Sequence, residues 1–309
     1  MKSLRIGTRG STLARWQAEF VRSGLARYGI ATELVIIRTS GDRDRQSSLR
    51  VIGGKGVFTK ELEDALLDRR IDLAVHSMKD MPTALPTGLE IAAICERDDV
   101  RDALISGGGL KLDQLPAGAR IGTSSLRRQA QLRHYRRDLE MADMRGNVDT
   151  RLAKLAQGNY DAIVLAKAGL ERLGKAERIS EIVPPEVCLP AAGQGAIGIE
   201  TRKRENELSA AVRKLNHDPS RVAVEAERAV LAGLEGGCQV PMGVWCRAAS
   251  GSLIIDACVL SADGSESIRE SRTGALENGR ELGRSVAAAL LDRGADRLLR
   301  LAGRGVEHS

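Results

Sequence analysis

The stretch LRIGTRGS at residues 4–11 sets a pattern that returns as RIGTSS at residues 120–125. Each copy combines a short apolar run, an Ile-Gly-Thr turn and a serine that can cap the helix-like sequence after it. The first of these helices is amphipathic, with an expected apolar face made by Leu13, Trp16, Phe20 and Leu25. The repeat predicts two lobes that share one strand–turn–helix plan.

A second correspondence supports two related lobes. Helix-like residues 59–69 lead into DLAVH at 72–76, and helix-like residues 148–156 lead into DAIVL at 161–165. Strands that alternate with helices favour sheets with parallel pairing, so we expect an α/β fold.

The character of the chain changes after Asp218-Pro219. A helix is expected at 223–234, followed by a cysteine loop and two apolar runs at 244–246 and 253–260. A turn at 262–264, a last helix at 276–291 and a frayed tail at 303–309 complete the pattern. This segment predicts a small third domain of α+β type.

The composition narrows the class of partner. The net charge is +6 over 309 residues, which favours an acidic partner such as nucleic acid, anionic lipid or a polyanionic small molecule. Aromatic residues make up only 2%, too few for the stacking platforms that bind single strands, and no zinc finger or basic coiled coil is present. We therefore expect no nucleic acid and favour a small molecule.

The cysteines and the apolar runs indicate the compartment. The five cysteines form no CxxC pair and have no histidine at metal-ligand spacing, which argues against disulfides and structural zinc. The N-terminus lacks a signal-peptide core, and no apolar run reaches the roughly 18 residues of a membrane span. The expectation is a cytoplasmic protein without metal or membrane.

Cys238 lies in the run GGCQVP at 236–241. The glycines permit a tight turn and close approach, and the proline stiffens the loop. A thiol presented in this way can act as a nucleophile or a covalent tether. The alternative is a buried, inert thiol in a turn.

The two Ile-Gly-Thr turns are candidate anion sites, because each delivers a helix N-terminus. Cations accompany them, and arginine forks bind carboxylates in a bidentate way. These cations are Arg9 at the first turn, Arg127 and Arg128 at the second, and Arg145 and Arg151 further along. The alternative is that they are solvated residues on helix faces.

The run HSMKDMP at 76–82 follows a buried-looking strand, and strand C-termini are where open α/β sheets bind ligands. Asp80 could stabilise a developing cation or move protons, or it could instead cap a turn before Pro82. His76 fits a structural role better than that of a base.

Two glycine motifs do not indicate nucleotide binding. GQGAIG at 193–198 fits G-x-G-x-x-G, but no clear strand precedes it and a strand, not a helix, is expected to follow. VIGGKG at 51–56 lacks the Ser or Thr of a P-loop, and we interpret it as a mobile loop that brings Lys55 near the site.

Together these motifs resemble the porphobilinogen deaminase family, from about residue 6 to residue 259. The resemblance rests on residues 7–9, 54–56, 75–80, 122–129, 145–151, 193–195 and 237–239. It implies two related lobes of the type-2 periplasmic-binding kind plus a small C-terminal α+β domain. The implied domains are 1–96 with a return segment 195–215, then 97–194, then 216–309 with the cofactor cysteine.

The resemblance also implies the activity. Such a transferase joins four porphobilinogen units head to tail on a dipyrromethane cofactor, held by a thioether to Cys238 and itself made from two such units. Each unit loses ammonia, and the resulting azafulvene cation is attacked by the free α-carbon of the chain. Hydrolysis then releases linear hydroxymethylbilane for haem biosynthesis. The family implication is a cytoplasmic monomer that can hand its product to uroporphyrinogen-III synthase.

The family's functional residues map onto this sequence one by one. Asp80 matches the catalytic carboxylate. The matching cofactor-binding residues are Cys238, Lys79, Asp80, Thr123, Ser124, Arg127 and Arg128, and the matching substrate-binding residues are Arg9, Ser11, Lys55, Ser77, Arg145, Arg151, Arg172 and Gln194. Gly10 departs from the Gln or Lys that relatives usually carry in this turn.

Two rival classes remain at this stage. Two lobes could close on a small dicarboxylate in a non-catalytic binding protein, although such a binder needs neither Cys238 nor Asp80. A nucleic-acid binder would instead show affinity that falls steeply with salt.

Overall fold

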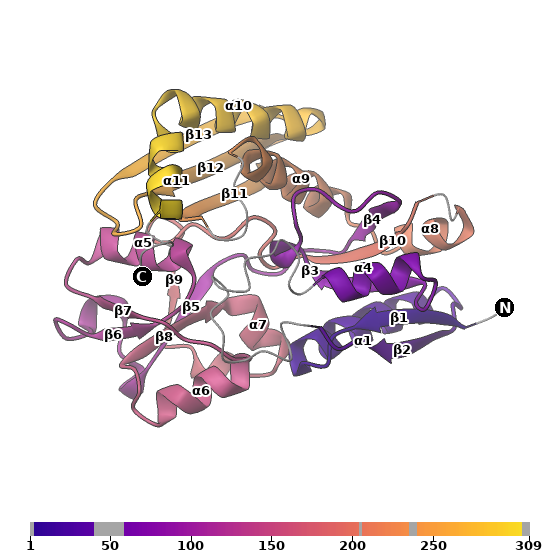
Figure 1. Cartoon of the computed structure of the whole chain (residues 1–309), viewed down its shortest axis with the longest axis horizontal. Coiled ribbons are helices and arrows are strands. Elements are labelled where there is room, and N and C mark those ends of the chain that lie inside the picture. Colours follow the sequence, from indigo (N-terminus) through magenta and orange to yellow (C-terminus); the bar gives the residue numbers. More distant parts are fainter. Residues whose placement is uncertain (1–2, 40–58, 204–205, 235–239, 305–309) are drawn as a thin grey trace. The chain divides into compact units, whose positions relative to one another are not determined.

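The computed structural model describes residues 3–39, 59–203, 206–234 and 240–304 (Figure 1). The chain forms two compact units, one of residues 1–98 and 195–221 and the other of residues 99–194 and 222–309. The second unit contains both the second predicted lobe and the C-terminal segment, so the division into three domains stays a prediction.

The first unit is built on a five-stranded sheet with the order β2-β1-β3-β10-β4. β1 runs parallel to β2 and β3, whereas β10 runs antiparallel to β3 and β4. Its elements are β1 (Leu4–Thr8), α1 (Thr12–Ala26), β2 (Thr32–Ile36), α4 (Lys60–Leu67), β3 (Leu73–Ser77), a 3-10 turn (Met78–Asp80), β4 (Leu89–Ile94), β10 (Ile197–Arg202) and α8 (Asn206–Arg213).

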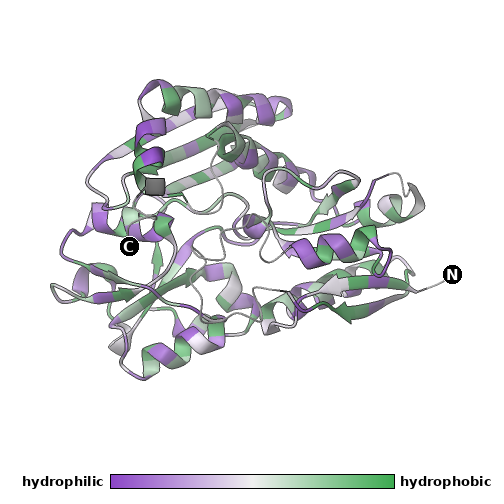
Figure 2. Ribbon diagram, in the orientation of Figure 1, coloured by the Kyte–Doolittle hydropathy of each residue, from purple (hydrophilic) through white to green (hydrophobic). Residues whose placement is uncertain are grey.

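Helices cover both faces of this sheet. Val21 of α1 and Val212 of α8 pack with Ile6 and Leu73 on one face, and Leu66 of α4 belongs to the core of the other. Successive strand residues point to opposite faces, so both faces need apolar side chains. Figure 2 shows hydrophobic residues in the strands of the sheets, with polar residues among them.

The second unit repeats this plan in the order β7-β6-β8-β5-β9. β6 runs parallel to β7 and β8, and β5 runs antiparallel to β8 and β9. The elements are β5 (Asp102–Ser106), 3-10 turns at Gly107–Gly109 and Leu112–Gln114, β6 (Arg120–Gly122), α5 (Leu126–Tyr135), β7 (Glu140–Ala142), α6 (Val148–Ala156), β8 (Ala162–Ala166), α7 (Lys167–Arg172), a 3-10 turn (Ala176–Arg178) and β9 (Glu181–Val183).

The remainder of the second unit is a three-stranded antiparallel sheet in the order β11-β12-β13 with helices packed on it. Its core includes Val230, Val244, Ile255, Val286 and Leu298. The elements are β11 (Met242–Ala249), β12 (Ser252–Leu260), β13 (Ser267–Ala275), a 3-10 turn (Leu276–Asn278), α10 (Gly279–Asp292) and α11 (Ala295–Arg304), and α9 (Asp218–Gly233) precedes the sheet in the chain. The predicted fold class is confirmed in its two related α/β lobes and its small α+β part.

The Ile-Gly-Thr segments were predicted to be turns, but residues 6–8 lie in β1 and residues 121–122 lie in β6. The glycines of these two strand ends have the same packing requirement. A Cβ at Gly7 would lie 2.2 Å from Ile71 Cδ1, and one at Gly122 would lie 2.7 Å from Met144 Cε. Each glycine therefore lets a neighbouring side chain pack directly on the strand. The predicted serine caps are also present, since Ser11 accepts a hydrogen bond at the start of α1 and Ser125 at the start of α5.

Two details of the sequence prediction are wrong. The buried face of α1 is formed by Gln17, Ala18, Val21 and Leu25, whereas Trp16 and Phe20 are exposed and stack with their ring centroids 5.7 Å apart. The helix expected to be last is α10, and α11 follows it as far as Arg304, into the expected frayed tail.

Candidate active site

The first unit gathers predicted residues at one edge of its sheet. β1 and β3 are parallel neighbours, with Ile6 opposite Leu73, so their carboxyl ends lie together. Arg9 and Ser11 follow β1, and the 3-10 turn Met78–Asp80 follows β3. This is the edge at which open α/β sheets bind ligands.

Met78 fixes the turn that carries Lys79 and Asp80. Its side chain is buried, and its N–H donates to the Ala196 carbonyl at 3.0 Å. A Cβ at Gly198 would lie 2.2 Å from Met78 Sδ, so β10 provides the space for the methionine. With Met78 held in the core, Lys79 is half-buried and Asp80 is exposed.

Ser77 and His76, the two residues before Met78, each contact another side chain of the first unit. Ser77 Oγ accepts a hydrogen bond of 2.8 Å from Nε2 of Gln17, which is buried on α1. His76 Nε2 lies 2.9 Å from Glu200 Oε2, and both side chains are buried. His76 is therefore buried and paired, as the prediction of a structural histidine expects.

The second unit places its predicted residues in the same way. Thr123 and Ser124 follow β6, Arg145 follows β7, and Arg172 ends α7, the helix after β8. Because β6 pairs parallel with both β7 and β8, these carboxyl ends share one edge of the sheet.

Thr123 and Ser124 are tied into the fold. Thr123 is fully buried, and its Oγ1 accepts from the Ser125 N–H at 3.3 Å. Ser124 Oγ donates to the Met144 carbonyl and accepts from the Met144 N–H, both at 2.9 Å. Ser124 therefore fixes the loop that leads to Arg145.

Arg145 lies in the loop before α6 and Arg151 lies in α6, and hydrogen bonds join this loop to the helix. Arg151 Nε donates to the Gly146 carbonyl at 2.8 Å, and Lys154 Nζ donates to the Arg145 carbonyl at 3.2 Å. Gly146 has a φ of 117°, which an L side chain rarely adopts. Both arginines are half-buried, not fully solvated.

Arg127 and Arg128 are buried, with exposures of 5% and 6%, so the solvated helix-face alternative is wrong for them. Arg127 Nη1 donates to Asp102 Oδ2 at 2.8 Å and to the Leu189 carbonyl at 2.6 Å. Arg128 Nη2 donates to Asp102 Oδ1 at 2.7 Å, and its Nη1 donates to the Val164 carbonyl at 3.0 Å.

Gln194 joins the same cluster. It is fully buried, and its Nε2 donates to Asp102 Oδ1 at 2.8 Å and to the Val100 carbonyl at 2.7 Å. Three predicted site residues therefore meet at Asp102.

Sequence reasoning missed Asp102 and Glu227. Asp102 opens the apolar run DALIS, and an acid at that position is a signal that could have indicated a buried ion pair. Glu227 is buried in the middle of α9, where its carboxylate accepts from the N–H groups of Gly193 at 2.7 Å and Cys246 at 2.8 Å. No sequence pattern marks Glu227, although it fixes the turn before Gln194.

The cluster around Asp102 carries unbalanced charge. Burial alone would raise the pKa of Asp102, but the charges and hydrogen bonds of Arg127 and Arg128 outweigh it and hold that pKa well below its usual range. One carboxylate thus faces two guanidinium groups. Arg128 Nε is buried without a hydrogen-bond partner among the described residues. A buried excess of positive charge with an unmet donor fits a ligand carboxylate.

The predicted cysteine loop and lysine loop cannot be placed, since Cys238 and Lys55 lie outside the described residues. Within the described ranges four cysteines have buried side chains: Cys95, Cys188, Cys246 and Cys258. Burial raises the pKa of the Cys188 thiol to about 12, so this group is a poor nucleophile.

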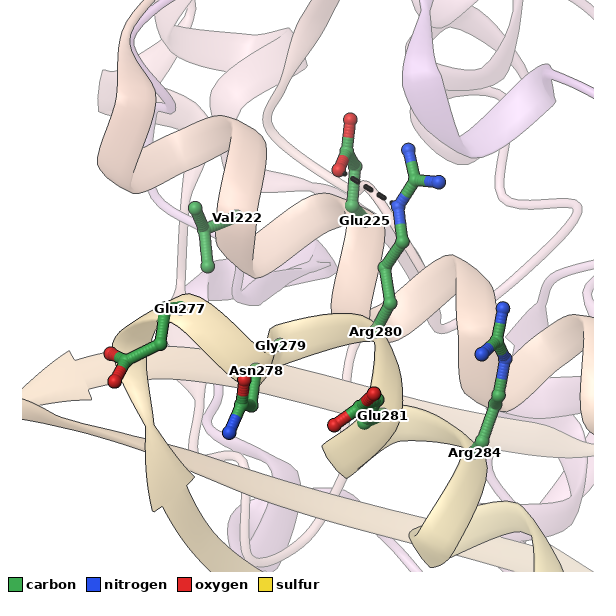
Figure 3. A pocket seen from close by; sticks show the side chains of 8 residues that line it. All are labelled: Val222, Glu225, Glu277, Asn278, Gly279, Arg280, Glu281 and Arg284. Carbon is green, nitrogen blue, oxygen red and sulfur yellow. Dashed lines mark hydrogen bonds and ion pairs between the residues drawn. The ribbon is translucent and has the colours of Figure 1, made fainter.

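A pocket of about 360 Å³ lies between α9 and the start of α10 (Figure 3). Glu225 and Arg280 form an ion pair of 3.0 Å at its wall. It contains none of the predicted site residues. Across the ranges with assigned structure, no group of His, Cys, Asp or Glu is arranged to hold a metal ion, and no described helix has the length and apolar character to cross a membrane.

Comparison with known proteins identifies the family. Residues 4–210 match the family model for the porphobilinogen deaminase, dipyromethane cofactor binding domain, and residues 222–292 match the porphobilinogen deaminase, C-terminal domain. The chain belongs to the porphobilinogen deaminase family.

Curated relatives match this chain over almost its whole length. Porphobilinogen deaminase from Desulforudis audaxviator is 52% identical over 95% of this chain and 96% of its own. The enzymes of Syntrophobacter fumaroxidans and Moorella thermoacetica are each 49% identical, over 96% and 97% of this chain and 96% of their own. Among solved structures, the VFT2 domain of Bordetella pertussis BvgS matches 69% of this chain and 86% of that domain, with 14% identity and a TM-score of 0.43, a likeness too weak to bear on function.

Family membership decides between the classes that the residues left open. The chain is an enzyme of the porphobilinogen deaminase family, which has a role in tetrapyrrole biosynthesis, and it contains the domain that binds the dipyrromethane cofactor. The alternative of a non-catalytic binding protein is therefore wrong.

Proposed function

We propose that this chain joins four porphobilinogen molecules head to tail and releases linear hydroxymethylbilane by hydrolysis. In balance, four porphobilinogen molecules and one water give one hydroxymethylbilane and four ammonia molecules. When bound, the dipyrromethane supplies the free α-carbon to which the first substrate unit is joined. We further propose that Cys238 holds it through a thioether, because GGCQVP presents the thiol on a glycine loop.

The observation that carries this proposal is the buried arginine cluster of the second unit. Each pyrrole bears an acetate and a propionate, so a growing chain presents many carboxylates. Arg127 and Arg128 together exceed the charge of Asp102, and Arg128 Nε lacks a partner among the described residues. Such a cluster suits carboxylate binding. The other proposed binding residues are Thr123, Ser124, Arg145, Arg151, Arg172 and Gln194 in the second unit, and Arg9, Ser11, Lys55, Ser77 and Lys79 in the first.

Asp80 is the proposed catalytic carboxylate. It is exposed on a turn whose neighbour Met78 is locked in the core, so its backbone position is fixed. A preorganised carboxylate stabilises positive charge that develops as ammonia leaves, and it can accept hydrogen bonds from pyrrole N–H groups.

The proposal is tested by incubating the purified chain with porphobilinogen and measuring the amounts of ammonia and linear tetrapyrrole formed. We expect four ammonia molecules for each linear tetrapyrrole, identified by its mass. Consumption of porphobilinogen without a linear tetrapyrrole would overturn the proposed reaction.

We also propose that the enzyme is a cytoplasmic monomer whose product passes to uroporphyrinogen-III synthase. The net charge of +6 favours the attraction of a polyanionic substrate and product from solution. Light scattering coupled to gel filtration should give a mass near 33.2 kDa. A mass twice that value would contradict the monomer.

A further inference from the structure

Asp102 belongs to none of the proposed binding sets, yet three members of those sets converge on it. It is fully buried at the start of β5. Its Oδ1 accepts from Arg128 Nη2 at 2.7 Å and from Gln194 Nε2 at 2.8 Å, and its Oδ2 accepts from Arg127 Nη1 at 2.8 Å. The Cys188 thiol lies 3.5 Å from Oδ2 as a weak fourth donor.

We propose that Asp102 is the positioning residue of this site: its carboxylate fixes the side chains of Arg127, Arg128 and Gln194 and so determines where carboxylates of the dipyrromethane or the growing chain can bind. This inference rests on the proposed function.

The geometry supports positioning because each donor is held at a second point. A backbone carbonyl also accepts from each side chain: Leu189 from Arg127, Val164 from Arg128 and Val100 from Gln194. A flexible arginine normally samples many rotamers, whereas these two are held between a buried carboxylate and a carbonyl. The site therefore presents its cations before a ligand arrives, which lowers the cost of binding.

Charge supports the same role. With Asp102 ionised, the cluster keeps one net positive charge, enough to pair with a single ligand carboxylate. Without it, two guanidinium groups share a buried space without an anion between them. They would separate or recruit an anion from solution, because buried unpaired charge is strongly unfavourable. The position of the carboxylate-binding groups would then be lost.

Two variants of the full chain test the proposal. Asp102→Asn keeps the shape but removes the charge, and we expect the fraction loaded with dipyrromethane, measured by intact mass, to fall together with a kcat loss of at least about tenfold. Asp102→Ala leaves room for an added carboxylate. We expect sodium acetate to restore part of its loading, and sodium chloride at the same concentration to restore none.

Asp99→Asn is the matched control. Its carboxylate pairs with Arg101 at 2.6 Å and Lys167 at 3.2 Å, so the same change removes a charge three residues away without touching the cluster. We expect wild-type loading and turnover. Full loading and wild-type kcat in Asp102→Asn would overturn the role of Asp102. A wild-type chain that neither loads nor turns over would overturn the proposed function and this inference with it.

A measurement on the unaltered chain covers the case in which the variants do not fold. In protein that carries no dipyrromethane, ¹⁵N NMR should show separate, slowly exchanging Nη signals for Arg127 and Arg128, because both side chains are already fixed. Averaged, fast-exchanging signals for both would overturn the proposal.

Discussion

Two aspartates, Asp80 and Asp102, show how single residues are used differently in this chain. Asp102 is fully buried and neutralises part of an arginine cluster, whereas Asp80 is exposed on a turn fixed by Met78. Asp102 therefore serves to arrange the cations, whereas Asp80 is available to a substrate. Replacing either removes one negative charge, but the expected consequences differ.

Asp80→Asn should fold and load its cofactor but turn over about 10²–10³-fold more slowly, because one preorganised electrostatic group is lost. The measurement is kcat at saturating porphobilinogen, with loading followed by intact mass. Asp68→Asn, an exposed carboxylate at the end of α4, is the control. Turnover near the wild-type value in Asp80→Asn would remove this residue from the catalytic role.

Glu63 provides a prediction about pH. Burial raises the pKa of Glu63, and the negative charge of nearby Glu200 raises it further. Since its folded-state pKa exceeds the unfolded value of about 4.3, its contribution to stability is complete below that value and is lost as pH rises through the folded-state pKa. Glu63→Gln, which cannot ionise, should therefore gain stability relative to the wild type as the pH rises above the unfolded value of about 4.3.

Urea unfolding of both proteins at several pH values measures this difference. Glu19→Gln, on the surface of α1, controls for the loss of one charge. A difference in unfolding free energy between Glu63→Gln and the wild type that stays constant with pH would contradict the argument.

At the scale of elements, the glycines of the repeated Ile-Gly-Thr segments at the ends of β1 and β6 make a direct prediction. Gly122→Ala should destabilise the chain by about 1–3 kcal/mol, since the added Cβ would crowd Met144 and Tyr160 at 2.7 and 2.9 Å. Gly10→Ala is the control, because its Cβ would meet only Ile36 at an ordinary 3.7 Å. Urea unfolding reports both effects. Equal stability of the two variants would show that the end of β6 does not need its glycine.

Local hydrophobic patterns predicted many helices and strands. They failed where the pattern fitted more than one helix face or where it was absent. The helix expected at residues 148–156 is α6 with the same bounds, because its apolar spacing is clear. On α1, Trp16 and Phe20 lie next to the true buried residues in the helical period, so their hydrophobicity pointed to the wrong face. β13 was not predicted, because SIRESRTGA is a largely polar edge strand without apolar alternation.

At the scale of the whole molecule, the two five-stranded sheets have equivalent strand orders, and neither strand order could be predicted from local sequence. β10 enters the first sheet after the chain has formed the second lobe, and β5 begins the second sheet before that lobe's parallel strands. Arg127, Arg128 and Gln194, which contact Asp102, lie 25, 26 and 92 positions away from it in the chain. Such contacts depend on topology, so the motifs predicted the arginines but not the carboxylate that holds them.

The central claim is that this chain carries a covalent dipyrromethane at Cys238, and intact mass spectrometry of the wild type beside Cys238→Ala tests it most directly. We predict that the wild type exceeds its 33.2 kDa chain mass by two deaminated porphobilinogen units and that the variant does not. The same adduct on Cys238→Ala, or an unmodified wild type even after incubation with porphobilinogen, would contradict the claim.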